Sequence, residues 1–285
     1  MSITAAQVKE LRELTGAGIM DAKKALIESE GDIEKASELL RQKGIASADK
    51  KASRIAAEGV VSSIINGNVG AVVEVNCETD FVAKNQDFLN LVNTILTTIV
   101  EKNPADVDAL NATEVNGSNI DTLVKEAIAT IGEKITIRRF ERFEGSVATY
   151  IHNSKIGVLL EVDGSEEVMA RDICLHIASS GSEYISREEI PQEVIDEETR
   201  IEMGKEDLAN KPDQIKAKIV EGRVNKLMSQ RCLLEQAFVK NPDLTIQQLI
   251  EGKLTLTKFV KYTLGEGIEK KVDNFVEEVQ SQLNA

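Results

Sequence analysis

Apolar residues at helical spacing dominate the first fifty positions of the chain and predict three short helices. Thr4–Gln7 has the spacing of a capping box at the start of the first helix, and the glycines of Thr15–Gly18 end it. The second helix is predicted to end at Gly31, after which Asp32 caps a third helix that stops at Gly44. The apolar positions are Val8, Leu11 and Leu14 on one face of the first helix, Ile19, Ala22 and Leu26 in the second, and Ile33, Ala36, Leu39 and Leu40, which the third is expected to bury.

Alternating apolar and polar positions replace the helical pattern from residue 58 onward, and this alternation occurs in two similar copies. Glu58–Val61 begins the first copy, and Glu144–Val147 begins the second. The strand-like run 69–75 aligns with 156–162 after one inserted residue. Glycine in the turn region between two alternating strands is typical of a hairpin, so each copy predicts a hairpin.

Helical periodicity follows each predicted hairpin. The helix of the first copy ends at Asn103-Pro104, because the residue before a proline disfavours helical backbone. A further helix over 120–131 and a strand over 134–143 are expected between the copies. The apolar positions of the two helices are Phe88, Val92, Ile95, Leu96 and Ile99 in the first copy, and Val168, Ile173 and Ile177 in the second.

Residues 187–230 predict an antiparallel helical hairpin that opens at Pro191 and turns at Asn210–Pro212. Its apolar positions are too few for an independent domain, so it is either an arm packed on the body or a protruding arm for self-association. Short helix and strand signals over 244–261 close the body. The apolar positions of the arm are Val194, Ile201, Leu208, Ile215, Ile219, Leu227 and Met228.

A last amphipathic helix is expected after Gly265-Glu266-Gly267. It either packs on the body or reaches onto a partner protein. Its apolar positions are Val272, Phe275, Val276 and Val279.

Composition places the chain among helix-rich soluble proteins of one to three domains, with 42% apolar and 29% charged residues over 285 positions. The formal net charge of −14 disfavours a nucleic-acid surface, since phosphates would be repelled. Arg138-Arg139 is the one compact basic candidate, and a solvated strand end is the simpler interpretation. No secretion signal or membrane-spanning run is visible, which predicts a cytoplasmic protein without a membrane partner.

The sequence offers little chemistry for catalysis. Gly16-Ala17-Gly18 follows a helix and lacks the lysine and hydroxyl of a phosphate loop. Cys174 and His176 lie two residues apart on a predicted helix and therefore point in nearly opposite directions. Three widely spaced cysteines make neither a disulfide framework nor a zinc site. We therefore expect no enzyme activity, no metal and no cofactor.

Glu78–Asn85 combines acidic residues with a large aromatic at a junction between a strand and a helix. Such junctions usually lie on the surface, which would make Phe81 a wedge aimed at another protein. Alternatively, Thr79 or Asp80 caps a helix that begins near Val82, and Phe81 lies in the core. The second copy has Gly164–Glu167 at this place and no aromatic, which favours a function for Phe81.

Two stretches, Thr15–Leu26 and Thr79–Asn85, closely resemble the signature motifs of the bacterial translation elongation factor Ts family. The resemblance extends along the whole chain, although Ala22 stands where many members carry cysteine. It implies an α+β protein with a ubiquitin-associated-like three-helix module, a duplicated core, a helical hairpin arm and a C-terminal module. The implied divisions are 1–54 for the three-helix module, 55–140 for the first core half, 141–186 with 231–263 for the second, 187–230 for the arm and 264–285 for the C-terminal module.

The resemblance also implies a guanine-nucleotide exchange factor that binds elongation factor Tu in its GDP-bound and nucleotide-free forms. Phe81 would insert between helices near the magnesium site of that GTPase, and the arm would support a homodimer. An alternative is a scaffold that binds partners without exchange activity. The implied contact residues are Arg12, Thr15, Gly16, Gly18, Met20 and Lys23 in the three-helix module, Thr79, Asp80, Phe81 and Val82 in the wedge, His152 in the second core half and Phe275 in the C-terminal module.

Overall fold

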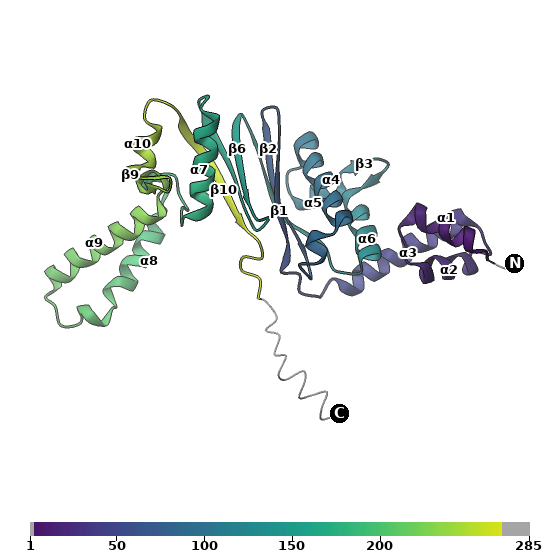
Figure 1. The fold of residues 1–285 in the computed structure, drawn as a ribbon. Helices are drawn as coiled ribbons and strands as arrows, with labels where there is room; N and C mark the ends of the chain where they lie inside the picture. The colour runs from purple at the N-terminus through teal and green to yellow at the C-terminus, as the bar shows by residue number, and fades with distance from the viewer. Residues whose placement is uncertain (1–2, 270–285) are drawn as a thin grey trace. The chain divides into compact units, whose positions relative to one another are not determined.

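The structure is a computed structural model that describes residues 3–269, so Phe275 and the rest of the predicted last helix lie outside the described residues. Helices and antiparallel sheets are both present, which confirms the α+β class (Figure 1). The chain divides into two compact units. Among the described residues, the first consists of 3–62, 73–140 and 263–269, and the second consists of 63–72 and 141–262.

The three-helix module consists of α1 (Ala5–Thr15), α2 (Ile19–Glu28) and α3 (Ile33–Lys51). The capping box at Thr4 is present, and Gly16 ends α1 with φ = 66°, a backbone angle that favours glycine. The helices share a core of small and branched side chains, which consists of Val8, Leu11, Ala22, Ala25, Leu26 and Ala36.

The prediction that the third helix stops at Gly44 is wrong, because α3 continues to Lys51. Gly44 lies against helix α6 (Ile120–Ile131), and a Cβ atom at this position would lie only 2.9 Å from the Cβ of Ala129. The missing side chain thus permits a close helix–helix approach and does not end the helix. Arg41, one turn earlier on α3, makes an ion pair of 3.3 Å with Glu126 of α6.

The first core half begins with the predicted hairpin, and its strands lie in the order β1-β2-β5. The helix predicted over 120–131 is present as α6, and the strand predicted over 134–143 as β5. Helix α4 ends before Asn103, as the proline that follows predicted. The elements are β1 (Glu58–Asn66), β2 (Val69–Cys77), η1 (Val82–Lys84), α4 (Gln86–Lys102), α5 (Val107–Ala112), β3 (Glu114–Val115), β4 (Ser118–Asn119), α6 and β5 (Thr136–Glu144).

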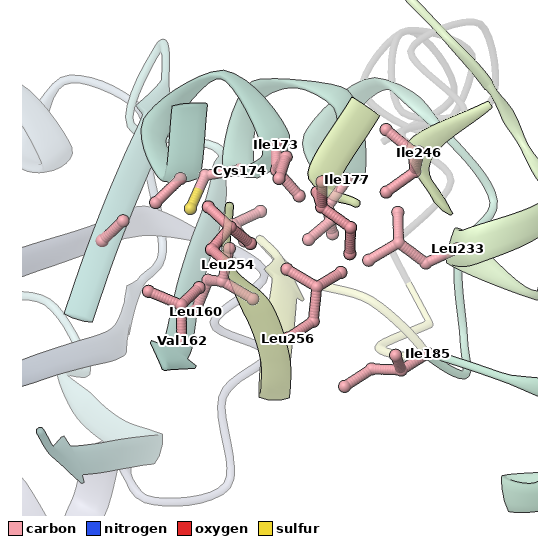
Figure 2. Close-up of a cluster of buried hydrophobic side chains, with 14 of the residues drawn as sticks. Leu160, Val162, Ile173, Cys174, Ile177, Ile185, Leu233, Ile246, Leu254 and Leu256 are labelled. Carbon is pink, nitrogen blue, oxygen red and sulfur yellow. The ribbon is translucent and has the colours of Figure 1, made fainter. Parts of the chain in front are cut away.

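The second core half repeats the hairpin and helix with β6 (Ser146–His152), β7 (Ile156–Asp163) and α7 (Glu167–Ser179). The one-residue insertion lies in the turn, which has three residues here and two between β1 and β2. Strand β10 (Thr255–Thr263) completes the sheet in the order β10-β7-β6. Helix α7 packs on this sheet, and Figure 2 shows the apolar side chains between them. Val168 is 78% exposed, so its predicted place on the buried face is wrong.

Two glycines at matching positions show why both copies begin alike. Gly59 and Gly145 have φ values of 135° and 143°, a region that residues with a side chain rarely adopt. A Cβ atom at Gly59 would lie 2.1 Å from the carbonyl oxygen of Val75. Glycine is therefore required for the start of the first hairpin.

The arm consists of α8 (Gln192–Met203) and α9 (Asp213–Arg231), which pack on each other as predicted (Figure 1). Pro191 immediately precedes α8. The remaining elements of the second unit are η2 (Arg187–Glu189), η3 (Glu206–Leu208), η4 (Leu233–Glu235), β8 (Ala237–Phe238), β9 (Asn241–Thr245) and α10 (Ile246–Ile250). The arm has its own apolar cluster, whose buried members are Ile190, Leu208, Val220, Val224, Met228 and Cys232.

Candidate functional site

Phe81 lies on a short turn between β2 and α4 and is 81% exposed, the highest value among the large apolar side chains whose burial the structure describes. The alternative that placed Phe81 in the core is therefore wrong. An aromatic side chain left in water forgoes its hydrophobic stabilisation, so Phe81 adds little to the stability of the fold and is free to contact a partner.

The turn itself is well bonded. The backbone N–H of Val82, the first residue of the 3₁₀ helix η1, donates to the Thr79 hydroxyl at 3.3 Å. Lys84 N–H donates to the Phe81 carbonyl at 3.2 Å, and the Lys84 ammonium lies 2.8 Å from the Asp80 carboxylate. These bonds link residues before Phe81 in the chain to residues after it and so fix the backbone of the turn. Helix α4 begins later than expected and has its own cap, Asn85.

Glu133, which follows α6, is a residue of this site that the sequence did not reveal. Its carboxylate accepts the backbone N–H groups of Glu78 and Thr79 at 3.1 and 3.0 Å and the Thr79 hydroxyl at 2.7 Å. A lone glutamate after Gly132 gives no periodic signal, and its partners lie more than fifty positions away.

The sequence-predicted residues of the three-helix module gather at the α1–α2 turn. Thr15 donates its hydroxyl to the Leu11 carbonyl at 2.6 Å, and the Arg12 guanidinium donates to the Ala17 carbonyl at 3.3 Å. Arg12 therefore braces the turn that contains Gly16. Thr15 and Gly18 line a groove of about 580 Å³ within the first unit.

Helix α2 presents an exposed face beside that turn. Ile19 and Met20 are 57% and 62% exposed at its first positions, and Lys23 is also exposed one turn later. Ile27 continues this face at 57% exposure. Residues four apart on a helix share one side, so this is an apolar stripe with a cation in it.

His152 ends β6 in the second unit and is exposed. Its ring stacks on Tyr150, with centroids 6.2 Å apart, and its Nδ1 lies 3.2 Å from the Tyr150 hydroxyl. The neighbouring aromatic thus holds the imidazole in one orientation on the surface of the hairpin.

Cys174 and His176 are both buried on α7, and each has structural surroundings. Burial raises the pKa of the Cys174 thiol to about 12, so the thiol stays protonated and is a poor nucleophile. His176 Nδ1 accepts the Val239 N–H at 3.2 Å, so its Nε2 carries the proton and donates to Gln236 at 2.8 Å.

Arg138 and Arg139 are not a solvated strand end, and that interpretation is wrong. Both pair with Glu74, which is fully buried, at 2.9 and 2.7 Å. Burial opposes ionisation of Glu74, but hydrogen bonds from the Gly265 N–H, Arg138 and Arg139 outweigh it and lower its pKa. Arg139 also pairs with Glu266, so these arginines fix the loop at residues 265–266.

In the described part of the chain, none of the helices is both long and apolar enough to cross a membrane. Within the same residues, histidine, cysteine and carboxylate side chains form no group of three that could hold a metal ion.

Comparisons with known proteins agree with the two motifs. Residues 78–266 match the family model described as Elongation factor TS. The chain is 46% identical over 288 residues to the elongation factor Ts of Alkalilimnicola ehrlichii, a match that covers 99% of both chains. It is 47% identical over 280 residues to the elongation factor Ts of Chromobacterium violaceum, with 97% of both chains covered. The family-model match begins at Glu78, the first residue of the turn that carries Phe81.

Proposed function

Since the chain belongs to the elongation factor Ts family, we propose that it is a guanine-nucleotide exchange factor for elongation factor Tu in translation. It binds Tu·GDP, promotes release of GDP and leaves the nucleotide-free partner ready for GTP. It has no catalytic chemistry of its own. The observation that carries this proposal is the near-full-length match to elongation factor Ts, and the exposure of Phe81 on a bonded turn supports it.

An exchange factor acts by binding the nucleotide-poor conformation of its partner more tightly than the GDP·Mg²⁺ conformation, because equal affinity for both would shift nothing. Phe81 inserts between helices of the GTPase near its magnesium site, with Asp80 beside it. Loss of Mg²⁺ removes the bridge between the metal and the phosphates. Burial of one phenylalanine contributes about 1.5–3 kcal/mol, which is about ten- to a hundredfold in an equilibrium constant.

Such a contribution is too small for full exchange, so further contacts are part of the proposal. The α1–α2 turn, with Arg12, Thr15, Gly16, Gly18, Met20 and Lys23, binds the GTPase domain. His152 in the second core half contacts another domain of Tu. Phe275 in the C-terminal module adds a contact with the GTPase domain. The arm, 187–230, mediates a homodimer, and its exposed apolar residues Ile201, Met203 and Ile215 support this role.

GDP release from purified elongation factor Tu, with and without this protein, tests the proposal. We expect acceleration by the wild-type chain and a plateau rate at least tenfold lower for Phe81→Ala, because the side chain that fills the opened gap is removed. Val168→Ala is a matched control, since it shortens another exposed apolar side chain, on α7. A wild-type chain that binds Tu without faster release would be a scaffold and not an exchange factor.

A further inference from the structure

One carboxylate holds the backbone that leads into Phe81. Glu133 Oε2 accepts both the Glu78 and the Thr79 backbone N–H, and Oε1 accepts the Thr79 hydroxyl. Three donors thus converge on a single side chain, over distances of 2.7–3.1 Å. Hydrogen bonds to an ionised acceptor are stronger than neutral ones and fix the geometry of both donors.

The Thr79 hydroxyl transmits this constraint to the residues after Phe81. Because its proton points to Glu133, its lone pairs face the Val82 N–H at 3.3 Å. The Thr79 carbonyl accepts the Ala83 N–H at 3.3 Å and the Cys77 thiol proton at 3.1 Å. The backbone before and after Phe81 therefore depends on the position of Thr79.

Glu78, whose N–H donates to Glu133, also accepts a hydrogen bond from the residue that follows Glu133. The Glu78 carboxylate accepts the Lys134 N–H at 2.6 Å and the Arg54 guanidinium at 3.2 Å. The Lys134 ammonium donates to the carbonyls of Ala52 and Arg54 at 2.7 and 2.9 Å. Three segments that are distant in sequence are thereby tied together beside Phe81.

We propose that Glu133 is a positioning residue for partner binding: it acts through Thr79 to keep Phe81 exposed in one orientation before the partner arrives. This inference rests on the proposed function of Phe81. Without the carboxylate, the turn populates several conformations and only a fraction of molecules is competent. The apparent dissociation constant rises by the inverse of that fraction, so a competent fraction of about one tenth raises it about tenfold.

The first test needs no partner. Hydrogen exchange of the Glu78 and Thr79 amides in the free protein is compared between the wild type and Glu133→Ala. We expect at least tenfold faster exchange in the variant, since their acceptor is gone. Glu101→Ala is the matched control, because it removes the same charge from an exposed position on α4. Unchanged exchange at Glu78 and Thr79 would overturn the inference, whatever Phe81 does.

The second test is stimulated GDP release from elongation factor Tu as a function of exchange-factor concentration. For Glu133→Ala we expect a half-saturating concentration about tenfold higher and a plateau rate within twofold of wild type, because the partner orders the turn once bound. Phe81→Ala instead lowers the plateau. In the Phe81→Ala background, Glu133→Ala should change the half-saturating concentration less than twofold, since Glu133 acts through Phe81.

The outcomes separate this inference from the proposed function. If Phe81→Ala has no effect on release but Glu133→Ala does, both the wedge and its positioning by Glu133 are refuted. If Phe81→Ala slows release but Glu133→Ala leaves the titration unchanged, only the positioning role is refuted. Should Glu133→Ala fail to fold, Glu133→Gln keeps the size and one acceptor oxygen, and an intermediate rise in half-saturating concentration is then expected.

Discussion

His176 is a titratable residue whose surroundings require the neutral form. Its Nδ1 accepts a backbone N–H, and protonation of that nitrogen would place two donors face to face. Burial lowers its pKa below the ordinary value of 6.5, and the hydrogen bond to Gln236 only partly opposes this. His176 therefore binds a proton less readily in the folded chain than in the unfolded chain.

The sign of the resulting pH dependence follows from this difference. Well above pH 6.5 the histidine is neutral in both states, and its contribution to stability is fully present. As the pH falls below 6.5, the unfolded state gains protons first and the free energy of unfolding decreases. We expect His176→Gln to reduce the slope of unfolding free energy between pH 6.5 and 5, measured by urea denaturation. If the variant has the wild-type slope, His176 binds the same number of protons in the folded and unfolded states over this pH range.

Among individual residues, the sequence predicted those whose role depends on local spacing. The Thr4 capping box, the Asp32 cap and the helix end before Pro104 follow from neighbours within a few positions. The sequence did not decide whether Phe81 lies in the core or on the surface, because burial depends on which other parts of the fold cover the side chain. Glu133 could not be found, since its function arises from bonds to Glu78 and Thr79 across the fold.

At the scale of elements, two glycines inside helices have different surroundings: one lies against a neighbouring helix and the other faces solvent. Gly44 on α3 faces Ala129, and an added Cβ would approach that side chain to 2.9 Å. Gly222 on α9 faces open space, with nothing within 4 Å of an added Cβ. Periodicity cannot distinguish the two, because a glycine that ends a helix and one that admits a neighbouring helix look alike in sequence.

The pair gives a matched prediction for substitution by alanine. Gly222→Ala should raise the free energy of unfolding by about 0.5–1 kcal/mol, since alanine restricts the unfolded chain without a clash. Gly44→Ala gains the same helix propensity but overpacks the α3–α6 contact, at a cost of about 1–3 kcal/mol, so we expect a net loss. Urea denaturation followed by helical circular dichroism measures both. A stabilised Gly44→Ala would mean that α3 and α6 separate easily.

At the scale of the whole molecule, the hairpin and the helix that follows it occur twice, and the two copies differ in the side chains and turns that they carry. Glu74 on β2 and Glu161 on β7 occupy matching positions, and each takes its cationic partner from the neighbouring strand of its own sheet. Arg139 of β5 pairs with Glu74, and Lys258 of β10 lies 3.2 Å from Glu161. The aromatic turn occurs in the first copy alone among the described residues, so a repeated scaffold carries a site that is not repeated.

The arm is a second addition to the repeated scaffold, and its cluster of apolar residues is separate from the core between α7 and its sheet. We therefore expect replacement of 192–230 by a short glycine–serine linker to leave a chain that unfolds cooperatively. Its denaturant slope should fall with the surface removed, because that slope scales with the area exposed on unfolding. The shortened chain should still accelerate GDP release, because the Phe81 turn belongs to the other unit.

Light scattering at matched concentrations separates the two interpretations of the arm. If it mediates self-association, the full chain is a dimer and the shortened chain a monomer, since the exposed Ile201, Met203 and Ile215 are removed together. An obligate arm–body core would instead give a shortened chain without a cooperative transition, because Tyr184 and Cys232 would lose the apolar side chains packed on them. If both chains are dimers and unfold cooperatively, the dimer contact lies outside the arm, and if both are monomers the homodimer is refuted.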